Sequence, residues 1–156
     1  MLEVAIPDVG LLRLEHLVLD FNGTLARDGA LIDGVADRIG RLSAQMAVHV
    51  VTGDTFGNAR AALAGSAASL RMMPSQNQAE AKRAYLEALG RHASACIGNG
   101  ANDQLMMQSA ALAIAVIEQE GAAVATLQAA GLVVRNVLDA FDLLLNPLRL
   151  VATLRR

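Results

Sequence analysis

The sequence predicts a single α/β domain, 1–156, with a three-layer α/β/α, Rossmann-like arrangement around a parallel sheet. Its 156 residues are enough to bury a full hydrophobic core without cross-links. Hydrophobic residues make up 54% of the chain and charged residues 18%, as in folded globular proteins. The apolar segments are continuous rather than alternating, and amphipathic segments separate them. This is the pattern of a parallel sheet covered by helices on both faces.

The first two apolar segments, 2–6 and 11–15, are separated by the turn residues Pro7, Asp8 and Gly10. They predict a small N-terminal β-hairpin. Later apolar segments predict the strands of the parallel sheet. In order, these are 16–21, 47–51, 69–72, 94–97, 111–116 and 132–134.

The stretches between the strands predict helices. They cover 33–42, 56–63, 78–89, 103–109, 122–129, 137–145 and 148–154. Asp33 is a candidate N-cap of the first helix. The segment 78–89 is the clearest helix because it is rich in Ala, Glu, Lys and Leu. Gly131 ends the fifth helix, and Pro147 separates the last two.

Charge and hydropathy exclude several partners. The formal net charge is −2, and no lysine or arginine cluster is dense enough to follow a nucleic-acid backbone. Residues 1–10 lack the basic segment of a signal peptide. The uncharged apolar stretch 110–117 is too short to cross a bilayer. We therefore expect a soluble, cytoplasmic protein with no nucleic-acid or membrane partner.

The histidines and the single cysteine are expected to be structural. His16 and His49 lie in predicted strands and His92 in a loop, and nothing in the sequence places a nucleophile beside them. Cys96 lies in the apolar run 93–97, where a small buried thiol is the simplest interpretation.

Three predicted strands end in polar, glycine-bearing turns: 20–24 (DFNGT), 52–55 (TGDT) and 98–103 (GNGAND). Lys82 lies on the helix between the second and third turns. Each turn alone is weak evidence, because Asn, Asp and Gly are common in turns. Ligands of open α/β sheets bind beyond the carboxyl ends of the strands, so the ordered set predicts a site there.

The residue types in this set suit phosphoryl transfer, which needs a nucleophile, a divalent cation and positive charge near the transferred group. Asp20 can act as a nucleophile that forms an aspartyl phosphate. Thr52 offers a hydroxyl and an N–H to phosphoryl oxygens, and Lys82 an ammonium. Gly23 and Gly53 let backbone N–H groups approach a phosphate closely.

Oxygen ligands for Mg²⁺ are available in the same turns. They are the Asp20 carboxylate, the carbonyl of Asn22, and the side-chain oxygens of Asn99 or Asp103. Other interpretations remain open. Lys82 can be a solvated helix residue, Asn99 a turn former, and Asp103 a residue that stabilises a helix N-terminus.

The motifs resemble those of the haloacid dehalogenase-like superfamily. DFNGT resembles motif one, VVTGD motif two, Lys82 within QAEAKRAYLEAL motif three, and IGNGANDQLM motif four. TGD and GxGxND look most like the phosphorylation domain of P-type cation-pumping ATPases and the soluble P-type ATPase-like phosphatases. The resemblance implies a Mg²⁺-dependent phosphatase or phosphotransferase. Asp20 would accept the phosphoryl group, Thr52 would bind its oxygens, and Lys82 would neutralise the intermediate.

The chain departs from the superfamily pattern at two positions. Asn22 replaces an aspartate that serves as general acid and base, so activity is expected to favour activated phosphates. Asn99 replaces a metal-binding aspartate, which predicts weaker Mg²⁺ binding. Asp103 and Asp54 are candidates to compensate.

The spacing between the motifs also predicts a capless member of the superfamily. The segment 22–53 is filled by a helix and a strand, and 54–82 is similarly full. The site is then open to a phosphorylated substrate, small or macromolecular, or covered by a second subunit. The apolar tail 143–154 and the N-terminal hairpin are candidate surfaces for a homo-oligomer. Two alternatives are a non-catalytic phosphate- or nucleotide-binding regulatory module and a partner of a separate cation transporter.

Overall fold

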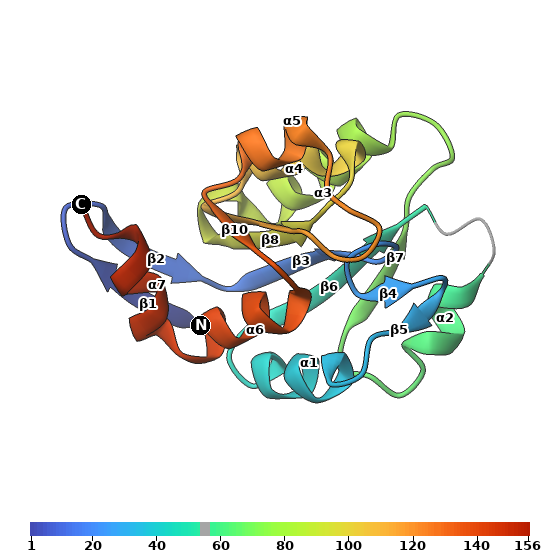
Figure 1. Ribbon diagram of the computed structural model, residues 1–156, viewed down its shortest axis with the longest axis horizontal. Helices are drawn as coiled ribbons and strands as arrows, with labels where there is room; N and C mark the ends of the chain where they lie inside the picture. Colours follow the sequence, from blue (N-terminus) through green and yellow to red (C-terminus); the bar gives the residue numbers. More distant parts are fainter. Residues whose placement is uncertain (54–56) are drawn as a thin grey trace.

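A six-stranded parallel sheet forms the centre of the computed structural model, which describes residues 1–53 and 57–156 (Figure 1). The strand order is β10-β9-β8-β3-β6-β7. The strands are β3 (His16–Asp20), β6 (Ala47–Thr52), β7 (Ser69–Met72), β8 (Ser94–Gly98), β9 (Leu112–Val116) and β10 (Leu132–Val134). The predicted parallel sheet is confirmed, and each strand ends within one residue of its expected position.

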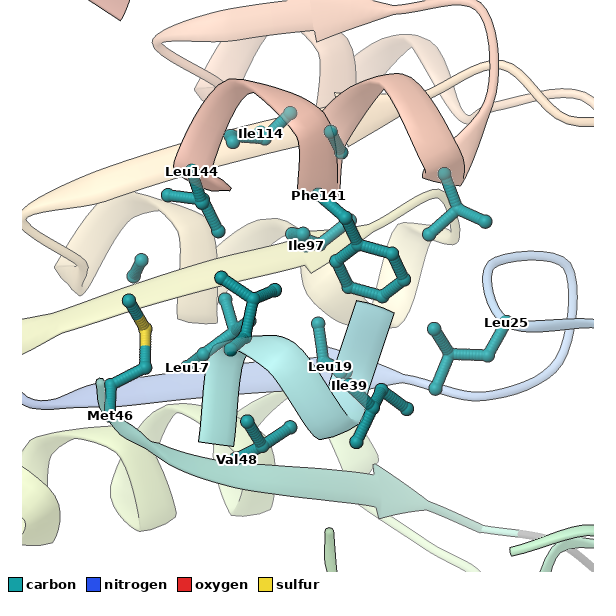
Figure 2. Packing of buried hydrophobic residues seen from close by; sticks show 14 of the residues in the cluster. Leu17, Leu19, Leu25, Ile39, Met46, Val48, Ile97, Ile114, Phe141 and Leu144 are labelled. Atoms are coloured by element: carbon teal, nitrogen blue, oxygen red, sulfur yellow. The ribbon is translucent and has the colours of Figure 1, made fainter. Parts of the chain in front are cut away.

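Helices cover both faces of this sheet. On one face lie α3 (Gln78–Gly90), α4 (Gln104–Ser109) and α5 (Val124–Ala129); on the other lie α1 (Val35–Ser43) and α6 (Val137–Leu145) (Figure 1). Successive residues of β3 point to opposite faces: Val18 packs with the cluster under α3 and α4, whereas Leu19 packs with Phe141 under α6 (Figure 2). Because both faces are buried, the strand is apolar at every position before Asp20 except its first.

The N-terminal hairpin is also confirmed. It consists of antiparallel β1 (Leu2–Ile6) and β2 (Gly10–Leu14), and α7 (Pro147–Leu154) packs against β1. In β1 buried and exposed residues alternate, because only one side of this small sheet is covered. The tail therefore contributes to the core, where Leu144 and Leu150 are buried, although Leu148 is 83% exposed. The homo-oligomer stays a prediction.

Two local features differ from the prediction. A second hairpin, β4 (Ala26–Arg27) and β5 (Ala30–Leu31), follows Asp20 and was not expected. Its turn is Asp28-Gly29, with both residues at positive φ (51° and 80°). Asp33 was wrong as the cap of α1: Gly34, at φ 88°, occupies that position, and no side chain caps the helix.

The remaining helical boundaries shift slightly. The segment 56–63 forms α2 (Asn58–Ala62) in its described part, and the helix 103–109 is preceded by a 3₁₀ turn, η2 (Ala101–Asp103). A further 3₁₀ turn, η1 (Arg91–Ala93), precedes β8. Cys96 is buried, as expected. Within the described ranges, every helix is too short or too polar to span a bilayer.

The connections between strands locate the site. From central β3 the chain proceeds outward to β6 and β7, then crosses back to β8 on the other side of β3. The direction of winding therefore reverses between β3 and β8. In open α/β sheets the carboxyl ends of such neighbouring strands flank a binding crevice. Asp20 ends β3, and the loop after β8 carries Asn99 and Asp103.

Candidate active site

Asp20 is the last residue of β3 and is only 6% exposed. The chain turns sharply after it, because the N–H groups of the next residues, Thr24 among them, donate to the carbonyl of Phe21 at 2.8–3.2 Å. Gly23 has φ 76°, and a Cβ there would lie 2.5 Å from the Asn99 amide nitrogen, so this position requires glycine. The turn brings the Thr24 hydroxyl to 3.2 Å from Asp20 Oδ2.

Lys82 lies on the buried face of α3 and is fully inaccessible to solvent. Its Nζ donates to Asp20 Oδ1 and to Asp103 Oδ1, at 2.6 Å in each case. Burial alone would lower the pKa of the Lys82 ammonium. The two carboxylates outweigh burial and raise that pKa above its ordinary value, so the side chain stays charged. The structure thus joins Asp20, Lys82 and Asp103 in one buried ionic group.

Both carboxylate oxygens of Asp103 are engaged. Oδ1 accepts from Lys82, and Oδ2 accepts from the N–H groups of Asn99 (3.1 Å) and Gly100 (3.0 Å). Burial, together with the nearby Asp20 carboxylate, raises the pKa of Asp103 to about 6, although Lys82 opposes this increase. A Cβ at Gly98 would lie 2.4 Å from Oδ2, so the loop after β8 wraps closely around this carboxylate.

The orientation of the Asn99 amide follows from its partners. Nδ2 donates to the carbonyl of Gly121 at 2.9 Å, and a carbonyl can only accept. The other end, Oδ1, therefore faces the Thr24 hydroxyl at 3.1 Å. The Thr24 hydroxyl is thus within hydrogen-bonding distance of both Asn99 Oδ1 and Asp20 Oδ2, so these two oxygens lie near each other.

These oxygens fit a hard cation such as Mg²⁺, which prefers carboxylate, amide and main-chain carbonyl ligands. Across residues 1–53 and 57–156, no three His, Cys, Asp or Glu side chains lie together where they could hold a metal ion. A site here must therefore include amide or main-chain oxygens. Asn99 and the carbonyl of Asn22 are the candidates from the sequence.

Thr52 and Gly53 follow on the neighbouring strand. Val51 pairs with Asp20, so Thr52 lies one residue beyond Asp20 toward the carboxyl edge, and it is 2% exposed. A Cβ at Gly53 would lie 2.2 Å from Gln78 Nε2, which shows how closely the start of α3 approaches this turn. Asp54, the other candidate for compensation, lies outside the described residues.

Asn22 is exposed at the mouth of the site. It lines a cavity of about 310 Å³ together with Asp28, Gly29, Asn58 and Glu120. Asn22 is also bridged to Ala26 at the start of the second hairpin. The structure therefore separates a buried ionic group, where Asp20 lies, from a polar mouth, where Asn22 lies.

Three residues near the site had no role in the sequence prediction. Thr24 is part of the DFNGT motif, and this position could have marked it as a site residue. Gln78 accepts a hydrogen bond from Asn102 Nδ2 at 2.9 Å and links the second and third turns. Glu120 reaches the mouth from the loop before α5 and accepts a hydrogen bond from the N–H of Asp28 at 3.4 Å. No sequence signal pointed to Gln78 or Glu120.

The strand histidines have a separate set of contacts. His16 Nδ1 lies 3.1 Å from His49 Nε2, and His49 Nδ1 lies 2.9 Å from the hydroxyl of Tyr85 on α3. Burial, aided by His16 and Arg71, lowers the pKa of His49 and favours its neutral form. This network joins β3, β6 and α3, as a structural role requires.

Comparison with known sequences gives one partial match. No family model matches the chain. An uncharacterized protein of Methanocaldococcus jannaschii is 51% identical over 59 residues, which are 38% of this chain and 63% of that protein. The chain thus covers less than two thirds of that relative, and the match names no activity.

Comparison with solved structures gives extensive matches. Cobalt-bound deoxy-D-mannose-octulosonate 8-phosphate phosphatase of Haemophilus influenzae has a TM-score of 0.70 at 15% identity, over 86% of this chain and 88% of that one. The Moraxella catarrhalis phosphatase, in complex with magnesium, phosphate and the octulosonate, has a TM-score of 0.67 at 15% identity, over 90% of each chain. A Legionella pneumophila structure described as a haloacid dehalogenase superfamily (subfamily III A) hydrolase has a TM-score of 0.69 at 18% identity, over 90% and 87%. At these identities the similarity establishes the fold.

Proposed function

We propose that this chain, which has the haloacid dehalogenase-like fold, is a Mg²⁺-dependent phosphatase or phosphotransferase with Asp20 as its nucleophile. The observation that carries the proposal is the buried group of Asp20, Lys82 and Asp103 at the carboxyl edge of the sheet. A buried lysine held by two carboxylates is costly to desolvate, so its position at a binding crevice favours a functional role. The phosphatases that share the fold support the same chemistry.

In this mechanism the Asp20 carboxylate attacks phosphorus. A bond forms between an Asp20 oxygen and phosphorus while the bond to the leaving oxygen breaks, and the electron pair departs with that oxygen. Lys82 holds Oδ1 of Asp20 from one side and fixes the carboxylate. Its ammonium would also neutralise the transferred group. Thr52 and the N–H of Gly53 would bind phosphoryl oxygens, and water would then hydrolyse the aspartyl phosphate.

A bound Mg²⁺ would polarise the phosphoryl oxygens and shield the charge of Asp20. The proposed ligands are Asp20, the carbonyl of Asn22 and the side-chain oxygen of Asn99, with Asp103 adding its charge beside them. Thr24 positions two of these oxygens through its hydroxyl. Because an amide takes the place of one carboxylate, we expect moderate affinity for the metal.

Asn22 determines which leaving groups are suitable. An amide can donate a hydrogen bond to the leaving oxygen, but it cannot transfer a proton. General acid catalysis contributes roughly 10²–10⁴-fold, so an alkoxide would leave slowly without it. Acyl phosphates and aryl phosphates need less help. The proposed activity therefore favours activated phosphates.

Phosphate release from acetyl phosphate and p-nitrophenyl phosphate, with and without Mg²⁺, tests this function. We expect Mg²⁺-dependent turnover in the wild type and loss of about 10³-fold or more in Asp20→Asn. Asp8→Asn, which changes an exposed aspartate in the N-terminal hairpin, is the control. A melting curve of each variant establishes that it is folded. Turnover that persists in folded Asp20→Asn would rule out the proposed nucleophile.

A second candidate function is a phosphate-binding regulatory module without turnover. It is favoured by the two amides, Asn22 and Asn99, at positions where catalysis is better served by carboxylates. This alternative predicts that phosphate with Mg²⁺ raises the melting temperature while no substrate is hydrolysed. Turnover that depends on Asp20 would exclude it.

A further inference from the structure

The cavity beside the candidate active site has a distinct lining. Its volume is about 310 Å³, at the lower end of the range for small-molecule sites. The described residues that line it are Asn22, Asp28, Gly29, Asn58 and Glu120. They come from the turn after β3, the tip of the β4–β5 hairpin, the start of α2 and the loop before α5. None of these side chains is apolar, so a hydrocarbon or an aromatic ring would find no partner there.

The cavity lies beside the turn that follows the proposed nucleophile, because Asn22 is part of its lining. Asn22 lies two residues after Asp20, and Gly23 lies between Asn99 and Glu120. A Cβ at Gly23 would meet Asn99 on the inner side and Glu120 Oε2, at 3.0 Å, on the outer side. The leaving group of a phosphate at Asp20 would have to pass Asn22 to reach this cavity.

The charges of the lining residues determine which leaving groups the cavity can accept. The lining described above contains two carboxylates, Asp28 and Glu120, and no Lys, Arg or His. The N–H of Asp28 donates to Glu120, which holds the two acidic residues on adjacent walls. Arg27, the neighbouring residue in sequence, lines a different cavity with Ala30 and Asp33. The described walls can therefore attract a cation and repel an anion.

We propose that this cavity binds the leaving group of the substrate, and that the substrate is a small acyl phosphate whose acyl group carries an ammonium and no carboxylate. The proposal rests on the proposed function, because it uses Asp20 as the position of the phosphate. The ammonium would lie against Asp28 and Glu120, and the side-chain amide oxygens of Asn22 and Asn58 would accept hydrogen bonds from it. A sugar acid such as an octulosonate would instead place a carboxylate against these two residues.

Three phosphonates of similar length test the proposal. They are 2-aminoethylphosphonate, propylphosphonate and 2-carboxyethylphosphonate, which carry a cationic, a neutral and an anionic end. Their carbon–phosphorus bond is not hydrolysed by this chemistry, so binding is measured without turnover. With Mg²⁺ at low ionic strength, we expect the amino compound to bind about tenfold tighter than the propyl compound, and the carboxy compound about tenfold weaker.

Variants identify the residues responsible. Glu120→Gln and Asp28→Asn should each reduce the ratio of amino to carboxy affinity about fivefold, because each removes one charge. Asn tolerates the positive φ of Asp28. Asp8→Asn is a matched control, since Asp8 is also an exposed hairpin-turn aspartate at positive φ (61°). This control should leave the ratio unchanged.

The outcomes separate this proposal from the proposed function. Equal binding of the amino and carboxy compounds, an unchanged ratio in Glu120→Gln, or no binding of any phosphonate with Mg²⁺ would each overturn the inference. Turnover of acetyl phosphate by a protein that shows no charge preference would overturn the inference alone. A clear charge preference in a protein without turnover would support the cavity's selectivity and refute the catalytic function.

Discussion

At the scale of single residues, Lys82 shows both the reach and the limit of sequence reasoning. Its place between the second and third polar turns was recognised, but a lysine on a helix beside Arg83 gives no sign of its own burial. The structure places Lys82 between Asp20 and Asp103, whereas Arg83 is exposed. Contacts that span 62 and 21 residues depend on how α3 packs on the sheet, and its helical pattern alone does not specify this.

Replacing Lys82 by Met should destabilise the fold strongly. The change leaves two buried carboxylates side by side without a cation, at a cost of about 3–5 kcal/mol. The measurement is urea unfolding at pH 7. Arg83→Met is the control, because it removes an exposed charge from the same helix and should change stability by about 0.5 kcal/mol or less. Equal losses in the two variants would contradict the buried ionic group.

In the proposed mechanism, replacing Asn22 by Asp should introduce a general acid. We expect kcat for an alkyl phosphate to rise by roughly 10²-fold or more, while kcat for acetyl phosphate changes little because its leaving group needs no proton. Steady-state kinetics with both substrates measure the difference. Asn58→Asp adds the same charge to the same cavity and should not produce the selective increase. A similar increase in both variants would assign the effect to charge alone.

At the scale of secondary-structure elements, turn chemistry explains the two local errors. The β4–β5 hairpin carries Asp-Gly at its turn, which is a recognisable hairpin signal, but its strands of two residues are too short to show a pattern. At α1 a nearby aspartate suggested a side-chain cap, yet Gly34 adopts the left-handed conformation and begins the helix. Local propensity allowed both arrangements, and the path of the chain from β3 to α1 selected one.

The helices α1 and α6 are joined by an ion pair. Arg38 donates from Nε and Nη2 to both oxygens of Asp142, at 2.8 and 3.0 Å. This contact lowers the pKa of Asp142 below its ordinary value. A carboxylate with a lowered pKa in the folded state adds stability above its unfolded pKa, near 3.9, and loses that stability as pH falls through the folded value.

Asp142→Asn should therefore reduce stability by about 1 kcal/mol at pH 7. The difference from the wild type should decrease below about pH 4, as Asp142 of the wild type binds a proton. Urea unfolding between pH 7 and pH 3 measures it. Asp33→Asn, which removes an exposed carboxylate near the start of α1, should cost little at either pH. A difference that grows on acidification would contradict the ion pair.

At the scale of the whole molecule, the parallel sheet and its helical layers were predictable because strands buried on both faces must be apolar throughout. The candidate site was predictable in part, since parallel strands align their carboxyl ends and so bring the turns after β3, β6 and β8 to one edge. The polar mouth of the site, where Asn22 lies, was not predictable from the sequence. Glu120 reaches it from a loop whose sequence resembles any polar turn, and the position of that loop follows from its hydrogen bonds to Asn99 and to Val134.

The proposed function requires a phosphoryl group covalently attached to Asp20. The most direct test is to mix the protein with acetyl phosphate and Mg²⁺, quench with acid within the first turnover, and locate the modification by peptide mass spectrometry. We expect one phosphoryl group on the peptide that contains Asp20, labile in base and absent from Asp20→Asn. A phosphoryl group on another residue, or turnover in the wild type without any covalent intermediate at Asp20, would contradict it.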